Sequence, residues 1–507
     1  MRSVRGTFLA VVTLSLAGQL CAVAYEIAVA GRLGTGAEAD ALALGLTLVV
    51  AGANEIVTWI SILFAPQYIE ARTRTGPVAA AAFLRATALI LIVGTALLGG
   101  ALYAAAPPLI ARLAPALAAG DAVRLLRLFA SLVLLLPLSA LLAATLQAQQ
   151  RFVTAGTRQL CWYGATLLSL LVLGGALGAA AVPLGMIAGI VLFCTILAAR
   201  LGSGSGGADP GEPVTPRLRR MAAWLPPLAL ASGVNYVNVT IERALAARLP
   251  EGSLAALTYA YRLLNFPVTL FVLTATTMLF PTLARHVARD DLPALEAMVS
   301  RALRLTLVIA VPCAGLAVVL AEPAVRLLLE RGAFTPESTR LTATALAWYA
   351  PGLVGLVGIQ VLARAYHALQ AIGQMTSIGV AVSAFNVLLM VLLSRALGLR
   401  GLAAAATIAA TVLFVAMLLG VRRRLPGLDL SAIVGCGGRS LAAAVVATGL
   451  AAVVSLSVAP GVTALAAATI AGLSAYLLVL ARLSRDDLWL VVGFVAPMLG
   501  RRSTDPA

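Results

Sequence analysis

The sequence predicts an all-α polytopic membrane protein of about 14 transmembrane helices, with two six-helix lobes related by a parallel repeat and two further C-terminal helices. Three observations predict this class. Of the 507 residues, 61% are hydrophobic and only 11% are charged, and the mean hydropathy is +1.00, a composition typical of membrane proteins. Apolar runs long enough to cross a bilayer recur along the chain. Segments of the second half also match segments of the first.

The apolar runs give the predicted spans in order. The first lobe contains runs near 7–30, 41–65, 79–105, 126–148, 160–178 and 181–199. The second lobe contains runs near 221–246, 256–284, 304–329, 341–367, 375–397 and 401–421. The last two runs lie near 438–459 and 462–481. The first run continues into further spans without a small-residue cleavage site, which indicates a retained helix rather than a signal peptide.

A polar stretch divides the two lobes. Residues 201–220, LGSGSGGADPGEPVTPRLRR, exchange the apolar pattern for Gly, Ser and Pro, which indicates a flexible cytoplasmic linker. Its GSGSGG is not a phosphate loop, because no strand precedes it and no Lys-Ser/Thr follows. The predicted organisation is a lobe over 1–200, a lobe over 221–424, and two further helices with a cytoplasmic tail over 425–507.

Three pairs of segments carry the internal repeat. The pairs are AGRLGTGAEADAL (30–42) with AARLPEGSLAALT (246–258), LFAP (63–66) with MLFP (278–281), and LAATLQAQQRF (142–152) with LARAYHALQAI (362–372). They occur in the same order at offsets of 216, 215 and 220 residues, which indicates a duplicated six-helix unit. Six is an even number, so both copies enter the membrane in the same orientation. Parallel repeats of this kind are typical of transporters that bind substrate between the halves.

The charge distribution predicts the topology. All 36 basic residues are arginine, and the net charge is +16. Most arginines fall at span ends and loops on the side of the membrane where the two termini lie. Both termini are therefore expected in the cytoplasm, with the protein in the plasma membrane. The arginines are scattered over short loops without interleaved aromatic residues, which argues against a nucleic-acid partner. Contact with anionic membrane lipids explains the charge better.

The motif content argues against an enzyme. The chain has two histidines and lacks GxSxG, HExxH and Walker sequences. No metal or organic cofactor is expected. A receptor or structural protein would not need polar residues spread through many helices of a duplicated bundle. A non-transporting scaffold stays open as an alternative, and it predicts that mutating Arg262 only destabilises the fold.

Arg262 is the most informative polar residue. It lies in LTYAYRLLNFPVTLF (257–271), where a guanidinium facing lipid costs a few kcal/mol, so we expect it to face protein or a wet cavity. Glu55 lies similarly deep. Glu26, Asp40, Glu242 and Arg364 lie nearer span ends, as interfacial charges or as functional groups. Asn265 and Asn386 either form interhelical hydrogen bonds or take part in function.

Several segments resemble a known family. They are GTGAEADAL (34–42), VNVTIERALAARLPEGSLAALTYAYRLLNFPVTLFVLTATTMLFPTLAR (237–285), ERGAFTPESTRLTATALAWYAPGLVGLVGIQVLARAYHALQ (330–370), FNVLL (385–389) and GLRGLAAA (398–405). These segments are similar to the MurJ/MviN lipid II flippases of the multidrug/oligosaccharidyl-lipid/polysaccharide exporter superfamily. The resemblance extends over nearly the whole chain up to about residue 425 and includes the expected span count.

The resemblance implies a function. A member of this family alternates between inward-open and outward-open states and moves an undecaprenyl-pyrophosphate-linked saccharide, lipid II or a related cell-envelope precursor, across the bacterial inner membrane. It would serve peptidoglycan biosynthesis, cell-wall biogenesis and cell shape, and is expected to act as a monomer. The last two helices would form a groove for the lipid tail. The alternatives are a flippase for an exopolysaccharide or O-antigen-type unit, and a cation-coupled multidrug exporter with twelve helices.

The family's functional positions transfer only in part. The resemblance places a loop aspartate at Asp40 and an eighth-helix arginine at Arg262, and it retains carboxylates at Glu26 and Glu242. An acidic position becomes Asn265. The positions where the family carries further arginines are Gln19, Tyr25, Gly52 and Ala53 here. Whether Arg364 compensates for them, the cargo differs, or the protein is a paralogue with weak or lost flipping activity stays open.

The expected site follows from this transfer. Arg262 is expected to bind pyrophosphate, in a substrate-binding set with Asp40, Asn265 and Arg364. Gating or ion coupling is assigned to Glu26, Glu55, Glu242 and Asn386. Coupling to the membrane potential, to H⁺ or to Na⁺ is open, because Asn386 could contribute to a sodium site but Met390 stands where a carboxylate would help.

Overall fold

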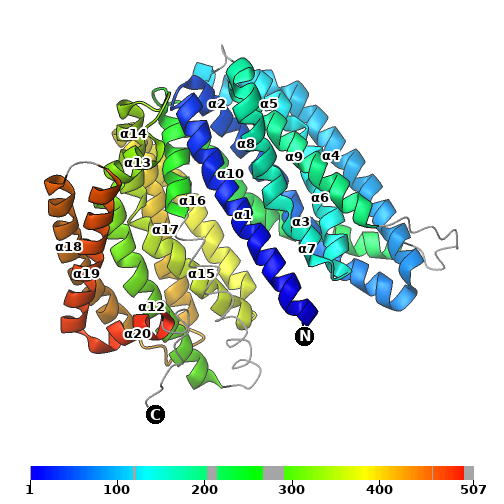
Figure 1. Ribbon diagram of the computed structural model, residues 1–507. Coiled ribbons are helices and arrows are strands. Elements are labelled where there is room, and N and C mark those ends of the chain that lie inside the picture. The colour runs from blue at the N-terminus through cyan, green and yellow to red at the C-terminus, as the bar shows by residue number, and fades with distance from the viewer. Residues whose placement is uncertain (1, 118–120, 202–213, 266–290, 459–460, 496–507) are drawn as a thin grey trace. The chain divides into compact units, whose positions relative to one another are not determined.

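The structure of the protein is a computed structural model that describes residues 2–117, 121–201, 214–265, 291–458 and 461–495 (Figure 1). All regular structure in these ranges is helical. The chain forms two compact units. The first unit comprises Met1–Ala255 together with Arg331–Thr335, and the second comprises Ala256–Glu330 together with Pro336–Ala507.

The first unit contains the helices drawn in blue to green in Figure 1. They are α1 (Arg2–Leu33), α2 (Ala37–Gly45), α3 (Gly52–Glu70), α4 (Pro77–Leu113), α5 (Ala122–Ala130), α6 (Leu132–Ala148), α7 (Phe152–Gly156), α8 (Arg158–Leu177), α9 (Ala181–Leu201) and α10 (Thr215–Ala246). Two π-helical segments, η1 (Leu46–Ala51) and η2 (Ala71–Thr75), flank α3. Because η1 continues directly from α2 into α3, residues 37–75 form one long membrane-span candidate.

The second unit begins within the helix 253–265 and contains the helices drawn in green to red in Figure 1. They are α12 (Leu292–Val319), α13 (Ala321–Leu329), α14 (Pro336–Tyr349), α15 (Gly352–Ala368), α16 (Ile372–Leu397), α17 (Leu399–Arg422), α18 (Leu430–Ser457), α19 (Val462–Leu483) and α20 (Arg485–Val495). Helices α18 and α19 pack against each other, and α18 also packs on α12.

The membrane character of the chain is confirmed. Within the described ranges, 10 helical segments are long and apolar enough to cross a bilayer, or up to 11 if a bent pair counts as one span. One of these segments, Val153–Leu201, corresponds to two predicted spans, which form a hairpin of α8 and α9. The predicted span 221–246 corresponds to α10, which is too polar to be among the ten. Most of the predicted span 256–284 lies outside the described residues.

Several boundaries differ from the prediction. The predicted span 304–329 is two helices, because α12 ends at Val319 and α13 follows separately. The predicted span 341–367 is also two helices, α14 and α15, bent by 48° around Pro351, since proline cannot donate to the helix and clashes with the preceding turn. Helix α10 begins at Thr215, inside the predicted linker 201–220. The lobe boundaries at 200 and 221 remain predictions.

Small residues let the helices approach closely. A Cβ atom added at Gly185 or Gly189 of α9 would overlap the backbone of α8. A Cβ atom added at Gly355 of α15 would overlap the backbone of α17, and one added at Gly358 would overlap the ring of Phe414. Between helices in lipid, van der Waals packing replaces the hydrophobic effect as the main attraction, so such close contacts favour association.

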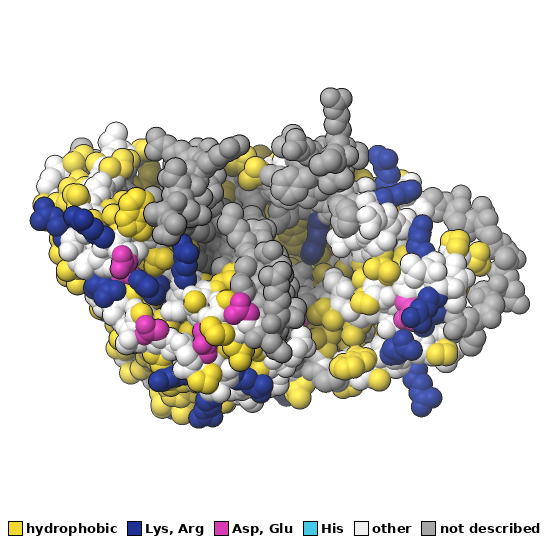
Figure 2. Space-filling view, turned by 90° about the horizontal axis from the view of Figure 1, so that it is seen from below, with side chains coloured by type: hydrophobic (Ala, Val, Ile, Leu, Met, Phe, Trp, Pro, Cys, Tyr) yellow, Lys and Arg dark blue, Asp and Glu magenta, His cyan; other side chains and the backbone are white. Residues whose placement is uncertain are grey.

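The outer surfaces of the helices are strongly apolar. Leu97 on α4 is 70% exposed and Leu456 on α18 is 88% exposed, and many large aliphatic side chains are similarly open. Figure 2 shows exposed hydrophobic side chains beside a gathering of arginines and carboxylates on one face. A surface of this kind is stable against hydrocarbon and would aggregate in water.

Candidate functional site

The N-terminal end of α2 and the N-terminal end of helix 253–265 cap each other. The Asp40 side chain is 4% exposed. Its carboxylate accepts hydrogen bonds from the backbone N–H groups of Gly252 at 2.8 Å and Ala255 at 2.7 Å. In return, Glu251 accepts a hydrogen bond from the N–H of Ala37 at 2.8 Å. The first N–H groups of a helix lack partners within it, and carboxylates also interact favourably with its dipole.

These two helix ends and the loops before them are equivalent in the internal repeat. Gly36 precedes α2 and Gly252 precedes helix 253–265, at the offset of 216 residues found in the sequence. A carboxylate from each copy therefore binds the helix N-terminus of the other copy. This reciprocal capping supports the duplication that the short sequence matches indicate.

A third loop joins the pair. The N–H of Ala333, in the RGAF turn, donates to the carbonyl oxygen of Gly31 at 2.7 Å. Gly332 and Gly252 have φ of +58° and +86°, a region that favours glycine. A Cβ atom added at Gly332 would overlap the carbonyl oxygen of Gly31, and one added at Gly252 would overlap the carbonyl oxygen of Thr35. We call these three loops with the adjoining helix ends, residues 31–40, 251–255 and 331–335, the loop latch.

Three further predicted residues lie in the first unit. Glu26 in α1, Glu55 in α3 and Glu242 in α10 are all half-buried. The structure places them on three different helices of the unit, and their predicted roles in gating or ion coupling remain predictions.

The positions where the resemblance expects arginine are filled differently here. Tyr236 of α10 packs against Gly52 and donates its hydroxyl to the Leu48 carbonyl oxygen at 2.5 Å. Ala53 is 2% exposed. Tyr25 is 1% exposed, and its ring centroid lies 5.8 Å from that of Tyr163 in α8. Aromatic side chains therefore occupy two of these positions, Tyr25 itself and Tyr236 against Gly52, while Ala53 is buried and Gln19 is exposed.

One polar contact in the first unit was not predicted. Arg158, the first residue of α8, donates from its guanidinium Nη2 to the side-chain oxygen of Asn54 in α3 at 3.2 Å. Both side chains are half-buried. Sequence reasoning missed Arg158 because it lies two residues before the predicted span 160–178 and resembled a loop arginine. The sequence feature that could have identified Arg158 is its position directly before an apolar run, which places it on the same helix.

The other predicted residues lie in the second unit. Arg262 and Asn265 are half-buried near the end of the described part of helix 253–265. The Asn265 side chain donates to the carbonyl oxygen of Tyr261, one turn earlier, at 3.0 Å. Arg364 in α15 and Asn386 in α16 are half-buried. The eight predicted residues thus divide equally between the two units.

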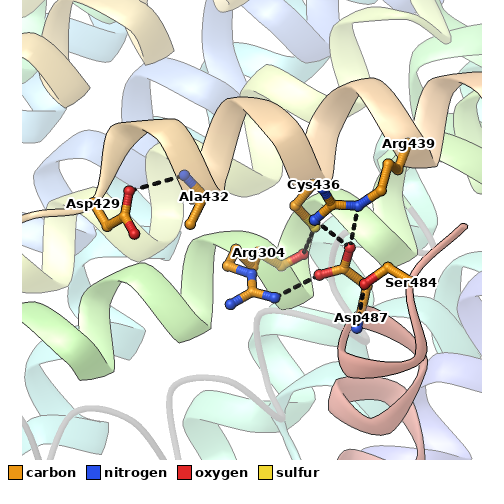
Figure 3. Close-up of polar contacts among 7 residues, drawn as sticks. All are labelled: Arg304, Asp429, Ala432, Cys436, Arg439, Ser484 and Asp487. Atoms are coloured by element: carbon orange, nitrogen blue, oxygen red, sulfur yellow. Dashed lines mark hydrogen bonds and ion pairs between the residues drawn. The ribbon is translucent and has the colours of Figure 1, made fainter.

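An ion cluster in the second unit was also missed, because the sequence was expected to end in a plain tail. Asp487 of α20 is fully buried and lies between two arginines (Figure 3). It pairs with Arg304 of α12 at 2.6 Å and with Arg439 of α18 at 2.7 Å. The N–H of Asp487 donates to the Ser484 hydroxyl at 3.2 Å. We call Arg304, Arg439 and Asp487 the C-terminal ion cluster.

Two opposing effects act on the Asp487 carboxyl. Burial raises its pKa, but the hydrogen bonds from Arg304 and Arg439 lower it more, so the net pKa is below the ordinary value. Asp487 is therefore ionised at neutral pH. It joins α20 to α12 and α18 through two ion pairs.

The fold and these sites define a class of protein. Duplicated helical halves that span a membrane, with charged side chains inside spans and repeat-related loops bound to each other, are typical of a transporter rather than an enzyme. The chain belongs to the lipid II flippase MurJ family, whose model matches residues 58–479.

Individual relatives agree with this family. The probable lipid II flippase MurJ of Rhizobium meliloti (strain 1021) is 32% identical over 200 residues, which are 39% of this chain and 37% of that protein. The lipid II flippase MurJ of Burkholderia cenocepacia is 29% identical over 209 residues, or 41% of this chain and 40% of that protein. The aligned parts therefore span about two fifths of the length of these curated relatives.

Solved structures share the fold over a larger part of the chain. A structure of lipid II flippase MurJ in an inward closed conformation matches with a TM-score of 0.79 at 18% identity, covering 95% of this chain and 99% of that one. An inward-facing multidrug resistance MATE family transporter of the MOP superfamily matches with a TM-score of 0.63 at 16% identity, covering 83% of this chain and 98% of that one. The predicted fold class is confirmed, while the count of about 14 spans remains a prediction.

Proposed function

We propose that the protein translocates lipid II, or a closely related undecaprenyl-pyrophosphate-linked saccharide, across the bacterial plasma membrane by alternating access. The family match over residues 58–479 is the observation that carries this proposal. The physical task suits a duplicated bundle, because a charged diphosphate and its sugars cannot cross hydrocarbon unaided. The polyprenyl tail can remain in lipid throughout.

In this proposal, the loop latch holds the external side of the transporter closed during one part of the alternating-access cycle. With both termini in the cytoplasm, the loop after the first span lies on the external side, and so does the latch. Opening this side requires Asp40 to release the N–H groups of Gly252 and Ala255, and water to replace it. The carboxylate thus favours the state in which the external side is closed.

The remaining assignments follow from charge. Arg262 binds the diphosphate, because a guanidinium forms forked hydrogen bonds with phosphate oxygens. Asn265 and Arg364 complete this part of the site. The carboxylates Glu26, Glu55 and Glu242, together with Asn386, take part in gating or in coupling to H⁺, Na⁺ or the membrane potential. The protein acts as a monomer without a cofactor.

Complementation tests the function. The resident lipid II flippase is depleted in a bacterium that expresses the full chain, and growth and headgroup translocation are measured. We expect rescue by the wild type and loss of rescue by Arg262→Ala. Arg85→Ala, which changes an exposed arginine of α4, is the matched control and should rescue fully. No rescue by a well-expressed wild type would argue against lipid II, and rescue by Arg262→Ala would remove its assigned role.

One observation favours a second cargo. Tyr25 and Tyr236 fill space where the resemblance expects arginines, so the first unit offers fewer cations to a diphosphate. A flippase for an exopolysaccharide or O-antigen-type lipid-linked unit is therefore the second candidate. Rescue of a strain lacking such a flippase, without rescue of the lipid II strain, would favour it. A twelve-helix drug exporter is disfavoured, since α18 and α19 add a further pair of apolar helices.

A further inference from the structure

Helices α1 and α3 of the first unit carry no cation along their apolar lengths. Arginine is absent from residues 6–31 and from residues 52–70. Helix α8 packs against α1, as the contact between Tyr163 and Tyr25 also shows, and its first residue reaches α3 through the hydrogen bond to Asn54. Arg158 therefore brings a positive charge to α1 and α3 from a third helix.

Within the described parts of the chain, Arg158 forms no ion pair with a carboxylate. Its segment, Val153–Leu201, is long and apolar enough to cross a membrane. The partner that the structure gives its guanidinium is the neutral amide of Asn54. A half-buried cation beside apolar helices without a counter-ion is costly, and such residues inside membrane proteins mark binding sites and ion pathways by default.

The Arg158 guanidinium keeps N–H donors that can bind an anion. A guanidinium has five N–H donors in a rigid fork, and Asn54 accepts one of them, which fixes the orientation of the group. Arg158 is half-buried, so its other donors are not all enclosed by protein. Arg85, in contrast, is exposed and bonds a carbonyl oxygen of its own helix at 3.4 Å.

We propose that Arg158 binds the diphosphate of the polyprenyl-linked substrate, with Asn54 as a positioning residue that orients the guanidinium. This inference rests on the proposed function and adds to it a cation from the first unit. The diphosphate carries more charge and more acceptor oxygens than a monophosphate, so Arg158 should select for the diphosphate over the monophosphate.

Direct binding tests this selection. The purified full chain in detergent is titrated with undecaprenyl diphosphate and, separately, with undecaprenyl monophosphate. Arg158→Gln keeps a polar side chain but removes the charge, and we expect it to weaken diphosphate binding about tenfold while monophosphate binding changes much less. Arg85→Gln is the matched control and should bind both lipids as the wild type does. An unchanged diphosphate affinity in Arg158→Gln would overturn the proposal.

Two further variants keep the test decisive. Arg158→Lys keeps the charge without the fork and should bind the diphosphate with intermediate affinity. It decides the question if Arg158→Gln does not fold, since wild-type affinity in the lysine variant would contradict forked recognition. Asn54→Leu frees the guanidinium from its orienting partner and should weaken diphosphate binding by a smaller factor, and an unchanged affinity would remove the positioning role.

Failure of this inference differs from failure of the proposed function. A wild type that translocates lipid II, with an Arg158→Gln variant that binds and translocates equally well, contradicts only the role of Arg158. A wild type that binds undecaprenyl diphosphate through Arg158 but does not rescue the depleted strain contradicts the lipid II assignment and leaves the binding site in place.

Discussion

At the scale of single residues, two buried carboxylates connect segments that are distant in the chain. Asp40 binds two backbone N–H groups in the loop latch, and Asp487 binds two guanidinium groups in the C-terminal ion cluster. Both side chains are buried, and a buried carboxylate is stable only where partners satisfy it. The sequence singled out Asp40 but not Asp487, because nothing local in RLSRDDLW distinguishes the residue that turns inward.

Replacing Asp40 should weaken the latch. Asp40→Ala leaves the buried N–H groups of Gly252 and Ala255 without their acceptor, which costs about 1–3 kcal/mol. Glu251→Ala is the matched control, because its bond to Ala37 is exposed and an exposed carboxylate at a helix N-terminus contributes about 0.3–1 kcal/mol. Thermal unfolding in detergent measures both free energies, and hydrogen exchange reports the loss of protection at residues 252–255. Equal effects of the two variants would contradict the structural role of Asp40.

The C-terminal ion cluster should make stability depend on pH. The pKa of Asp487 is lowered below its ordinary value of 3.8 in the folded protein. Its contribution is therefore complete above this value and is lost as the pH falls through the lower, folded-state pKa. Asp487→Asn should lower the thermal midpoint near neutral pH, and the difference from the wild type should shrink below about pH 4. A difference that stays constant over this range would mean that the charge is not responsible.

At the scale of elements, the apolar runs predicted which segments are helices, and tertiary contacts decided where they break. The bend between α14 and α15 coincides with Pro351 and was readable in principle. The division of α12 from α13 also has a marker, because Pro323 has no N–H to bond the Val319 carbonyl oxygen. The π-helical segment η1 has none, and its Leu48 carbonyl oxygen accepts a hydrogen bond from Tyr236 of a distant helix. Long-range hydrogen bonds of this kind leave no periodic pattern in the sequence.

Close helix packing gives a prediction at this scale. Gly189→Val should force α8 and α9 apart, since any Cβ atom there meets the backbone of Cys161, and overpacking typically costs about 1–3 kcal/mol. Gly94→Val on α4 is the control, because a Cβ atom at Gly94 meets no atom within 4 Å. Thermal unfolding of the two variants in the same detergent compares them. A destabilised Gly94→Val with an unaffected Gly189→Val would contradict the packing described.

At the scale of the whole molecule, the class, the pair of C-terminal helices and the family were predictable from composition, apolar runs and a few motifs. The candidate site was predictable in part. Arg262 and Asp40 stand out by sequence, because one is a charge in an apolar run and the other follows a glycine-rich turn. Arg158 does not, because its importance depends on Asn54, which is 104 residues away in the chain. A guanidinium that faces a distant helix cannot be recognised from local sequence.

The central claim is that the protein carries a lipid-linked diphosphate sugar across the membrane. The most direct measurement reconstitutes the purified full chain into liposomes that contain fluorescent lipid II, and follows the headgroup with a reagent that reacts only outside the vesicles. We expect the wild type to make the inner pool of lipid II accessible, and Arg262→Ala and protein-free liposomes to leave it protected. An inner pool that stays protected in the presence of folded wild-type protein, under an imposed membrane potential as well as without one, would contradict the claim.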